Sequence, residues 1–157
     1  MSPPDELSSL EYNGKPRRYF PCGAPVSVYL HQTPYLFSAS VRRNVEYGLR
    51  RCRLSPTLAA DALNWAGLSH LAANHADKLS GGEQSRCALA RVAALSPNLV
   101  LLDEPFAHLD AQGVALAVDL VARLRADNCA VVLISHDKIT FPANRRWHLE
   151  DGRLSEY

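Results

Sequence analysis

Two short, nearly unbroken apolar segments, residues 99–103 and 129–135, constrain the fold of this chain more than any other feature. A strand that is apolar at successive positions is typical of a parallel sheet covered on both faces, because neither face then meets water. The segment between them has apolar residues at helical spacing, at Val114, Ala117, Val118, Val121 and Leu124. Strand, helix and strand together predict a crossover unit and therefore an α/β fold.

The other segments complete the expected outline. Residues 10–12 and 26–31 are predicted as strands, and the first enters a tight turn at Asn13-Gly14, since Asn and Gly tolerate positive φ. Residues 146–155 predict a small hairpin that turns at Asp151-Gly152.

Residues 34–74 have a helical pattern that interrupts the strands. Ser55 is the expected N-cap of one helix, with Pro56 at its first position and Gly67 as its stop. This stretch predicts a helical lobe inserted into the sheet-forming part of the chain.

Composition limits the molecule without naming a partner. A chain of 157 residues that is 47% hydrophobic, with net charge +1, suits one domain with a buried core and lacks the basic excess expected of a nucleic-acid binder. An arginine cluster is therefore expected to be a solvated helix face: Arg42, Arg43, Arg50, Arg51 and Arg53. No apolar run approaches the roughly 20 residues that span a bilayer, and the start resembles no signal peptide. Cysteines without paired or metal-ligand spacing favour a reducing cytosol: Cys22, Cys52, Cys87 and Cys129.

The segment Ser80-Gly81-Gly82-Glu83 precedes an apolar helical run and has two interpretations. Ser-x-x-Glu is a capping box that satisfies the first free N–H groups of a helix. That interpretation leaves the two glycines unexplained, because glycine weakens a helix and is most useful where a backbone lies against a ligand. Exposed N–H groups at the positive end of the helix dipole would form an anion site.

Acidic and basic side chains follow the two apolar strands. Asp103-Glu104 could simply begin a loop, but in phosphoryl transfer one carboxylate holds Mg2+ and a neighbour positions the attacking water. We assign Asp103 to the metal and Glu104 to the water. His136 ends the next strand, so in a shared sheet it would lie on the same rim and could donate to a terminal phosphate.

Taken in order, these motifs resemble the nucleotide-binding domain of ABC transporters over nearly the whole chain. The segment Leu79 to Gln84 is similar to the signature motif. The segment Leu99 to Glu104 is similar to the Walker B strand with its glutamate, and His136 is similar to the switch histidine. Asp110 lies in a segment similar to the D-loop, and Gln32 resembles the Q-loop glutamine.

The resemblance implies a P-loop NTPase-like (RecA-like) parallel sheet core with an inserted helical subdomain. It implies ATP and Mg2+ as ligands, with Glu104, His136 and Gln32 as catalytic residues and Asp103 and Gln32 at the metal. Nucleotide contacts would come from Ser80, Gly81, Gly82, Glu83 and Asp110. The implied partners are a transmembrane permease and a second nucleotide-binding subunit, on the cytoplasmic face of the membrane. The expected division is 1–33 for the core strands and Q-loop, 34–78 for the helical subdomain, and 79–157 for the remaining motifs.

One family motif is missing from the sequence. A phosphate-binding loop needs G-x-x-x-x-G-K-[ST], whereas Gly14-Lys15 is followed by Pro16, and Ser9 stands in place of the first glycine. We therefore expect an incomplete core that begins downstream of the loop. The strand that carries the loop would pair with residues 131–134, so an unpaired apolar edge and poor solubility are expected.

Three functions remain open at this stage. The first is an ATP-hydrolysing transporter subunit with a truncated start, which we expect to serve import of a small nutrient or ion. The second is a P-loop-free partner that supplies Ser80 to another subunit's ATP without hydrolysing it, or a fragment with no function. The third is a soluble ABC protein of DNA repair or translation, which the short segment between Gln32 and Ser80 disfavours because it lacks coiled-coil heptads.

Overall fold

A computed structural model describes residues 11–12, 15–16, 27–107, 109–136 and 143–156. Two short strands, β1 (Glu11–Tyr12) and β2 (Lys15–Pro16), pair antiparallel near the N-terminus. The turn predicted at residues 13–14 and the serine at position 9 lie outside the described residues.

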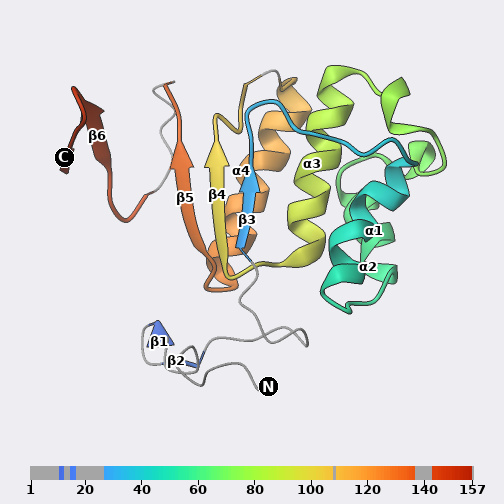
Figure 1. The fold of residues 1–157 in the computed structure, drawn as a ribbon, viewed down its shortest axis with the longest axis horizontal. Helices are drawn as coiled ribbons and strands as arrows, with labels where there is room; N and C mark the ends of the chain where they lie inside the picture. The colour runs from blue at the N-terminus through green and yellow to red at the C-terminus, as the bar shows by residue number, and fades with distance from the viewer. Residues whose placement is uncertain (1–10, 13–14, 17–26, 108, 137–142, 157) are drawn as a thin grey trace, which may run out of the picture.

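The centre of the fold is a three-stranded parallel sheet (Figure 1). It contains β3 (Ser27–Leu30), β4 (Leu99–Asp103) and β5 (Ala130–Ile134), in that order. Helix α4 (Ala111–Ala126) connects β4 to β5 as the predicted crossover. The α/β fold and the parallel pairing expected from the apolar segments are confirmed.

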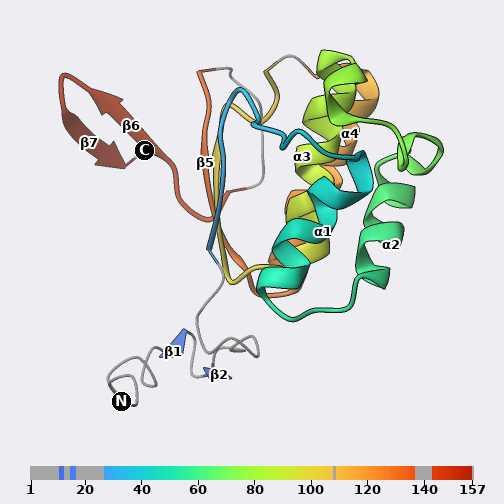
Figure 2. The same cartoon turned by 45° about the vertical axis from the view of Figure 1, so that its right-hand side comes forward.

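Among the described residues, helices cover only one face of this sheet (Figure 2). Helix α3 (Gly81–Leu95) and α4 pack on the face that carries Val100 and Leu102, both buried. The opposite face is apolar and exposed, with exposed fractions of 38% to 55% at Tyr29, Leu101, Val132 and Ile134. The expectation of strands buried on both faces is therefore wrong for the described part of the chain.

Helix α4 confirms the predicted stripe except at one position. Ala117, Val121 and Leu124 are buried with Leu120 against the sheet, whereas Val118 is 43% exposed. Each residue advances an α-helix by about 100°. Val118 therefore lies about 100° around the helix from the buried Ala117, on the side that faces solvent.

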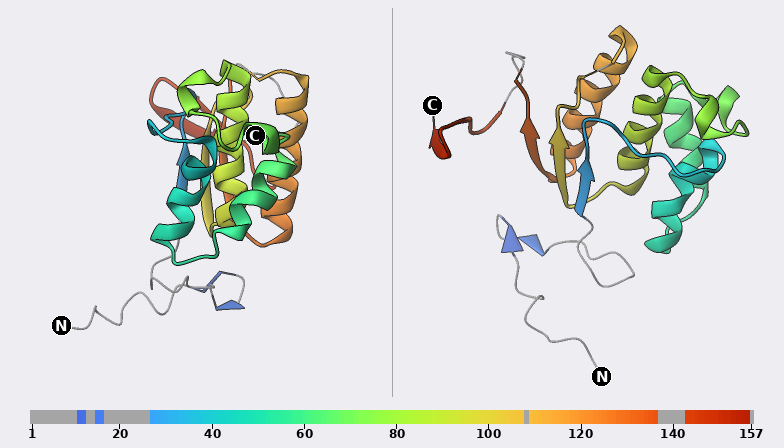
Figure 3. Two further views of the ribbon diagram at one scale, coloured as in Figure 1. Left: turned by 90° about the vertical axis from the view of Figure 1, so that its right-hand side faces the viewer. Right: turned by 45° about the horizontal axis from the view of Figure 1, so that its top comes forward.

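The helical lobe lies beside the sheet, as the two views of Figure 3 show. It contains α1 (Val41–Arg51), α2 (Thr57–Trp65) and two short 3-10 turns, η2 (Ser69–Leu71) and η3 (Ala76–Lys78). Helix α3 belongs to both halves, because Cys87 and Ala90 pack into the lobe while Leu89 and Val92 pack against the sheet.

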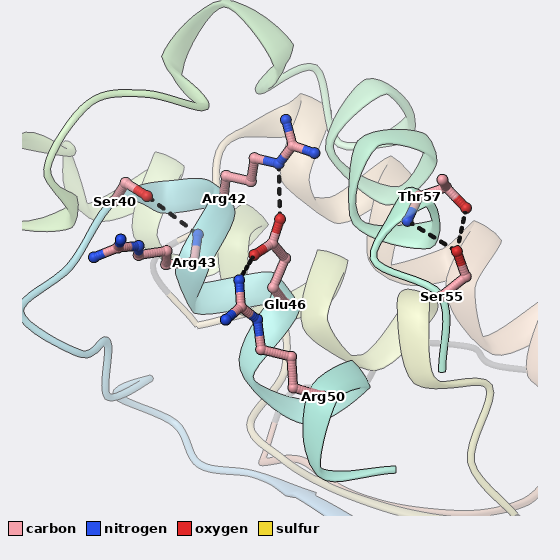
Figure 4. Close-up of polar contacts among 7 residues, drawn as sticks. All are labelled: Ser40, Arg42, Arg43, Glu46, Arg50, Ser55 and Thr57. Atoms are coloured by element: carbon pink, nitrogen blue, oxygen red, sulfur yellow. Dashed lines mark hydrogen bonds and ion pairs between the residues drawn. The ribbon is translucent and has the colours of Figure 1, made fainter. Parts of the chain in front are cut away.

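Helix α2 begins one residue later than predicted. Thr57 is its first residue and Pro56 occupies the cap position, although the Ser55 hydroxyl does accept a hydrogen bond from the Thr57 N–H at 3.3 Å (Figure 4). Its end agrees with the prediction: the helix stops at Trp65, and Gly67 follows in the left-handed region at φ 68°.

The arginine cluster in and after α1 is exposed, as expected from the sequence, and two of its members also pair with a buried carboxylate. Figure 4 shows Arg42 and Arg50 flanking Glu46, with nitrogen to carboxylate distances of 2.8 and 2.7 Å. The Glu46 side chain is 8% exposed, and hydrogen bonds from Arg50 and then Arg42 lower its pKa. Arg43, Arg51 and Arg53 are exposed.

The chain ends in the predicted hairpin. Strands β6 (Trp147–Glu150) and β7 (Arg153–Glu156) pair antiparallel around Asp151 and Gly152, which both have positive φ. None of the helices in the described part of the chain is long and apolar enough to cross a membrane.

Candidate nucleotide-facing site

The capping box predicted at the start of α3 is present. The Glu83 carboxylate accepts hydrogen bonds from the Ser80 N–H at 2.8 Å and from the Ser80 hydroxyl at 2.7 Å. In return, the Ser80 hydroxyl oxygen accepts a hydrogen bond from the backbone N–H of Glu83 at 3.4 Å. The Ser80 hydroxyl, followed by its N–H, holds the pKa of Glu83 below its usual value. The N–H groups of Ser80 and Glu83 are therefore satisfied within the helix start itself.

The two glycines have no purpose within the described fold. A Cβ atom built on Gly81 would meet nothing within 4 Å, and one on Gly82 would lie 3.6 Å from Asp110 Oδ2, an ordinary contact. Neither glycine has a positive φ. Since alanine would stabilise a helix by up to about 1 kcal/mol per position, packing within the described fold gives no reason for glycine at either position.

Asp110 lies beside this helix start. It is the N-cap of α4, where its Oδ1 accepts the Gly113 N–H at 2.7 Å and its Oδ2 accepts Arg86 Nη1 at 2.7 Å. The Gly113 N–H, and then Arg86, lower the pKa of Asp110. Arg86 comes from α3, so it ties α3 to the start of α4. Sequence reasoning missed Arg86, because nothing in its spacing from Ser80 indicates this partner.

Asp103 ends β4 with its carboxylate directed toward β3. The Tyr29 hydroxyl donates to Asp103 Oδ2 at 2.7 Å, and this hydrogen bond is the main cause of the raised pKa of Tyr29. The pairing follows from the register, because Tyr29 lies opposite Leu101 and so on the same sheet face as Asp103. A tyrosine within an apolar strand was the only sequence signal for this partner.

Glu104 turns the opposite way. It has a left-handed backbone at φ 46°, which directs its carboxylate toward the end of β5. There the carboxylate accepts one hydrogen bond from the backbone N–H of His136 at 2.7 Å and another from the Ser135 hydroxyl at 3.1 Å. His136 Nε2 lies 3.6 Å from Glu104 Oε1, and the histidine side chain is 96% exposed. The backbone turn therefore separates the adjacent carboxylates of Asp103 and Glu104.

Gln32 is exposed just beyond β3 and lines a shallow hollow together with Glu104 and Ser85. The structure thus gathers the predicted residues into two groups. Gln32, Glu104 and His136 follow the carboxyl ends of the strands, whereas the Ser80 to Glu83 segment and Asp110 lie at the starts of α3 and α4.

The donor set suits magnesium that arrives with a nucleotide. Asp103 and Gln32 offer oxygen atoms, which Mg2+ prefers, and Mg2+ is usually held by one or two carboxylates together with water and substrate phosphates. Within the described ranges, no group of three or more His, Cys, Asp or Glu residues could hold a metal ion on its own. Asp103 and Gln32 could each give one oxygen ligand to such an ion.

The strand order, the strand-end carboxylates and the inserted lobe define a nucleotide-binding fold of the P-loop NTPase-like class. The family model described as "ABC transporter" matches residues 22–107, which is more than half of the sequence. The chain belongs to this family.

Similar proteins agree with this assignment. The chain is 45% identical over 120 residues to "Aliphatic sulfonates import ATP-binding protein SsuB 3" of Nocardia farcinica, covering 74% of the chain and 48% of that protein. It is 36% identical over 131 residues to "Molybdenum import ATP-binding protein ModC" of Pseudomonas fluorescens, covering 80% of the chain and 36% of that protein. It is 38% identical over 140 residues to "Phosphate import ATP-binding protein PstB 2" of Natronomonas pharaonis, covering 80% and 49%.

The fold also matches a solved structure, "An inward-facing conformation of a putative metal-chelate type ABC transporter". The TM-score is 0.68 at 24% identity, over 86% of this chain and 59% of that one. The chain spans about half, or less, of the length of the three curated relatives.

Proposed function

We propose that the chain is the ATP-binding subunit of an ABC transporter and that its Ser80-Gly81-Gly82 segment contacts the phosphates of an ATP held mainly by a second nucleotide-binding subunit. The observation that carries this proposal is the open space over Gly81, where the fold has no internal need for glycine. Free backbone N–H groups at the positive end of α3 suit a phosphate. The Ser80 hydroxyl would add a further hydrogen bond, and Asp110 would lie beside the nucleotide.

The strand-end group has the composition of a hydrolytic site. Asp103 and Gln32 would hold Mg2+, which when bound neutralises phosphate charge. Glu104 would accept a proton from the attacking water, and His136, highly exposed and 3.6 Å from Glu104, would donate to the terminal phosphate. The printed sequence contains no G-x-x-x-x-G-K-[ST] motif, the loop whose N–H groups cradle nucleotide phosphates. The test below therefore addresses the role of Ser80, which does not depend on that loop.

The names of the relatives support import as the direction of transport. They concern sulfonates, molybdenum and phosphate, all of them small nutrients or ions. We propose the same coarse class of cargo for the transporter that contains this chain.

The helical lobe offers a surface to a permease. Tyr35 and Tyr47 are 72% and 51% exposed, and Phe37 lies between them with ring centroids 5.5 and 4.5 Å away. The buried Asn44 pins this loop, because its amide bonds both the N–H and the carbonyl of Phe37. A preorganised aromatic surface is typical of a binding site. We propose that residues 34–78 form the permease-facing subdomain, between core residues 1–33 and 79–157, and that the permease holds the chain at the cytoplasmic face.

A mixed ATPase assay tests the proposal. A full-length ATP-binding subunit with its own phosphate-binding loop is mixed with this chain, and hydrolysis is measured with and without Ser80→Arg. The wild-type chain should accelerate hydrolysis, and the arginine should remove the acceleration by occupying the phosphate position. Ala60→Arg, on the exposed side of α2, adds the same charge elsewhere and should leave the rate unchanged. Equal rates with the wild-type chain and with its Ser80→Arg variant would contradict the proposal.

A further inference from the structure

Trp65, the last residue of α2, lies where the two hydrophobic cores of the molecule meet. Its partly buried ring packs against the lobe core and also against the core formed by α3, α4 and the sheet. Among the described residues, no other partly buried hydrophobic side chain packs against both cores. Trp65 is therefore placed to register the orientation of one half relative to the other.

The indole is held by two charged side chains of α4. Trp65 Nε1 donates to Asp119 Oδ2 at 2.7 Å, across 54 positions of sequence. Arg123 Nε donates to the same oxygen at 2.7 Å, and the Arg123 guanidinium lies 5.6 Å from the centre of the indole ring. Hydrogen bonds to a charged group are stronger than neutral ones, and the cation–π contact adds to them. We call these three residues the α2–α4 clamp.

The turn after α2 lies close to α4 at the same corner. A Cβ atom built on Gly67 would lie 3.1 Å from Nε2 of the Gln112 side chain, which belongs to the first turn of α4. Glycine suits this turn because its φ is positive. The end of α2 therefore lies next to α4 at Gly67 as well as at Trp65.

The signature serine lies between the two halves that the clamp joins. Leu79, just before Ser80, is buried in the lobe core. Two turns into α3, Arg86 bonds Asp110 at the start of α4. A rotation of the lobe against α4 would therefore pull the Ser80 segment from one side while Arg86 holds it from the other.

We propose that Trp65, Asp119 and Arg123 are positioning residues that set the orientation of the helical lobe and, through it, the place of the Ser80-Gly81-Gly82 segment. The inference deepens the proposed function, since it takes that segment as the phosphate-contacting one. The claim that the clamp sets the orientation of the lobe can be tested without measuring ATP hydrolysis. The clamp lets lobe movement alter the geometry at Ser80 without a change in the residues that contact ATP.

Fluorescence and hydrogen exchange test the clamp on this chain directly. Trp147→Phe leaves Trp65 as the only tryptophan, since the sequence has two. In that background, Asp119→Ala should shift the Trp65 emission to longer wavelength. Amide exchange in residues 76–83 should become several-fold faster, while exchange in β4 stays unchanged. As a control, Asp61→Ala removes an exposed carboxylate from α2. It should change neither the Trp65 emission nor the exchange in residues 76–83.

A variant that preserves the ring separates the hydrogen bond from packing. Trp65→Phe should speed exchange in residues 76–83 as Asp119→Ala does, and combining the two should add little, because both remove the same bond. The proposal is overturned if exchange in residues 76–83 is unaffected, or if it changes only in step with β4, which would indicate general destabilisation. The two proposals can fail separately. If Ser80→Arg removes the acceleration of ATP hydrolysis but the clamp variants show unchanged amide exchange, the proposed function stands and the clamp is rejected.

Discussion

The start of α3 and the carboxyl ends of β4 and β5 lie at the same rim of the fold (Figure 1) but satisfy their polar groups differently. Ser80 and Glu83 satisfy each other, and the glycines between them leave open space. Asp103 and Glu104 instead accept hydrogen bonds from neighbouring strands, through Tyr29 and His136. The first region keeps its internal hydrogen bonds and has open space over Gly81 for a ligand from outside. The second would have to exchange protein partners for a nucleotide and its metal.

Glu104→Gln should have the largest effect on chemistry and tests the strand-end region. In any assembly where this chain contributes to hydrolysis, turnover should fall about 10²-fold to 10⁴-fold, the usual contribution of a general base. ATP binding should persist, because an amide replaces the carboxylate at equal size. Single-turnover hydrolysis and equilibrium ATP binding measure the two quantities, with Glu150→Gln on the exposed hairpin as control. Retained hydrolysis would refute the assignment of Glu104.

Two glycines sharpen the comparison through stability. Gly113→Ala should destabilise the fold by about 1–3 kcal/mol, as overpacking does, because the new Cβ would lie 2.8 Å from Leu109 Cδ2. Gly81→Ala should cost nothing and can raise stability by up to about 1 kcal/mol. Denaturant unfolding of both variants gives the difference. A large loss at Gly81 would show that the glycine serves the fold.

The uncovered sheet face predicts a difference in association between two equally exposed valines. Val132 and Val118 are 44% and 43% exposed, but Val132 belongs to β5, at the edge of the described sheet. Val132→Lys should raise the concentration at which light scattering begins, because a lysine on an edge strand opposes strand-to-strand pairing. Val118→Lys, on α4, should change it much less. Equal effects would indicate that general surface hydrophobicity controls solubility.

The smallest expected effect is the dependence of lobe stability on pH. The folded pKa of Glu46 is lowered by Arg50 and Arg42, so its contribution is present above the unfolded value, 4.5, and is lost as pH falls through the lower folded value. Glu46→Gln should therefore flatten the fall in unfolding temperature below about pH 5. Asp61→Asn, on the exposed side of α2, should leave that slope as it is.

Local patterns predicted most of the backbone. The apolar runs predicted β4 and β5. Gly67 predicted the end of α2, and the pair Ser80 and Glu83 predicted the N-cap of α3. Contacts that depend on tertiary placement were missed. Tyr29 reaches Asp103 through the strand register, Arg86 reaches Asp110 between two helices, and Trp65 reaches Asp119 across 54 positions. Period and composition carry no signal for these pairs, because each depends on how separate elements pack.

An isosteric pair at Ser80 tests the central claim most directly. Asp and Asn both cap helices well, but Ser80→Asp would place a carboxylate against Glu83, whose Oε2 lies 2.7 Å from the Ser80 hydroxyl. Both variants are therefore made in a Glu83→Gln background, where they should unfold within about 0.5 kcal/mol of each other. In the mixed ATPase assay, the aspartate should repel the partner's ATP phosphates and lower the acceleration at least about tenfold below that of the asparagine variant. Equal acceleration by the two variants would contradict the account and leave Ser80 as a helix cap alone.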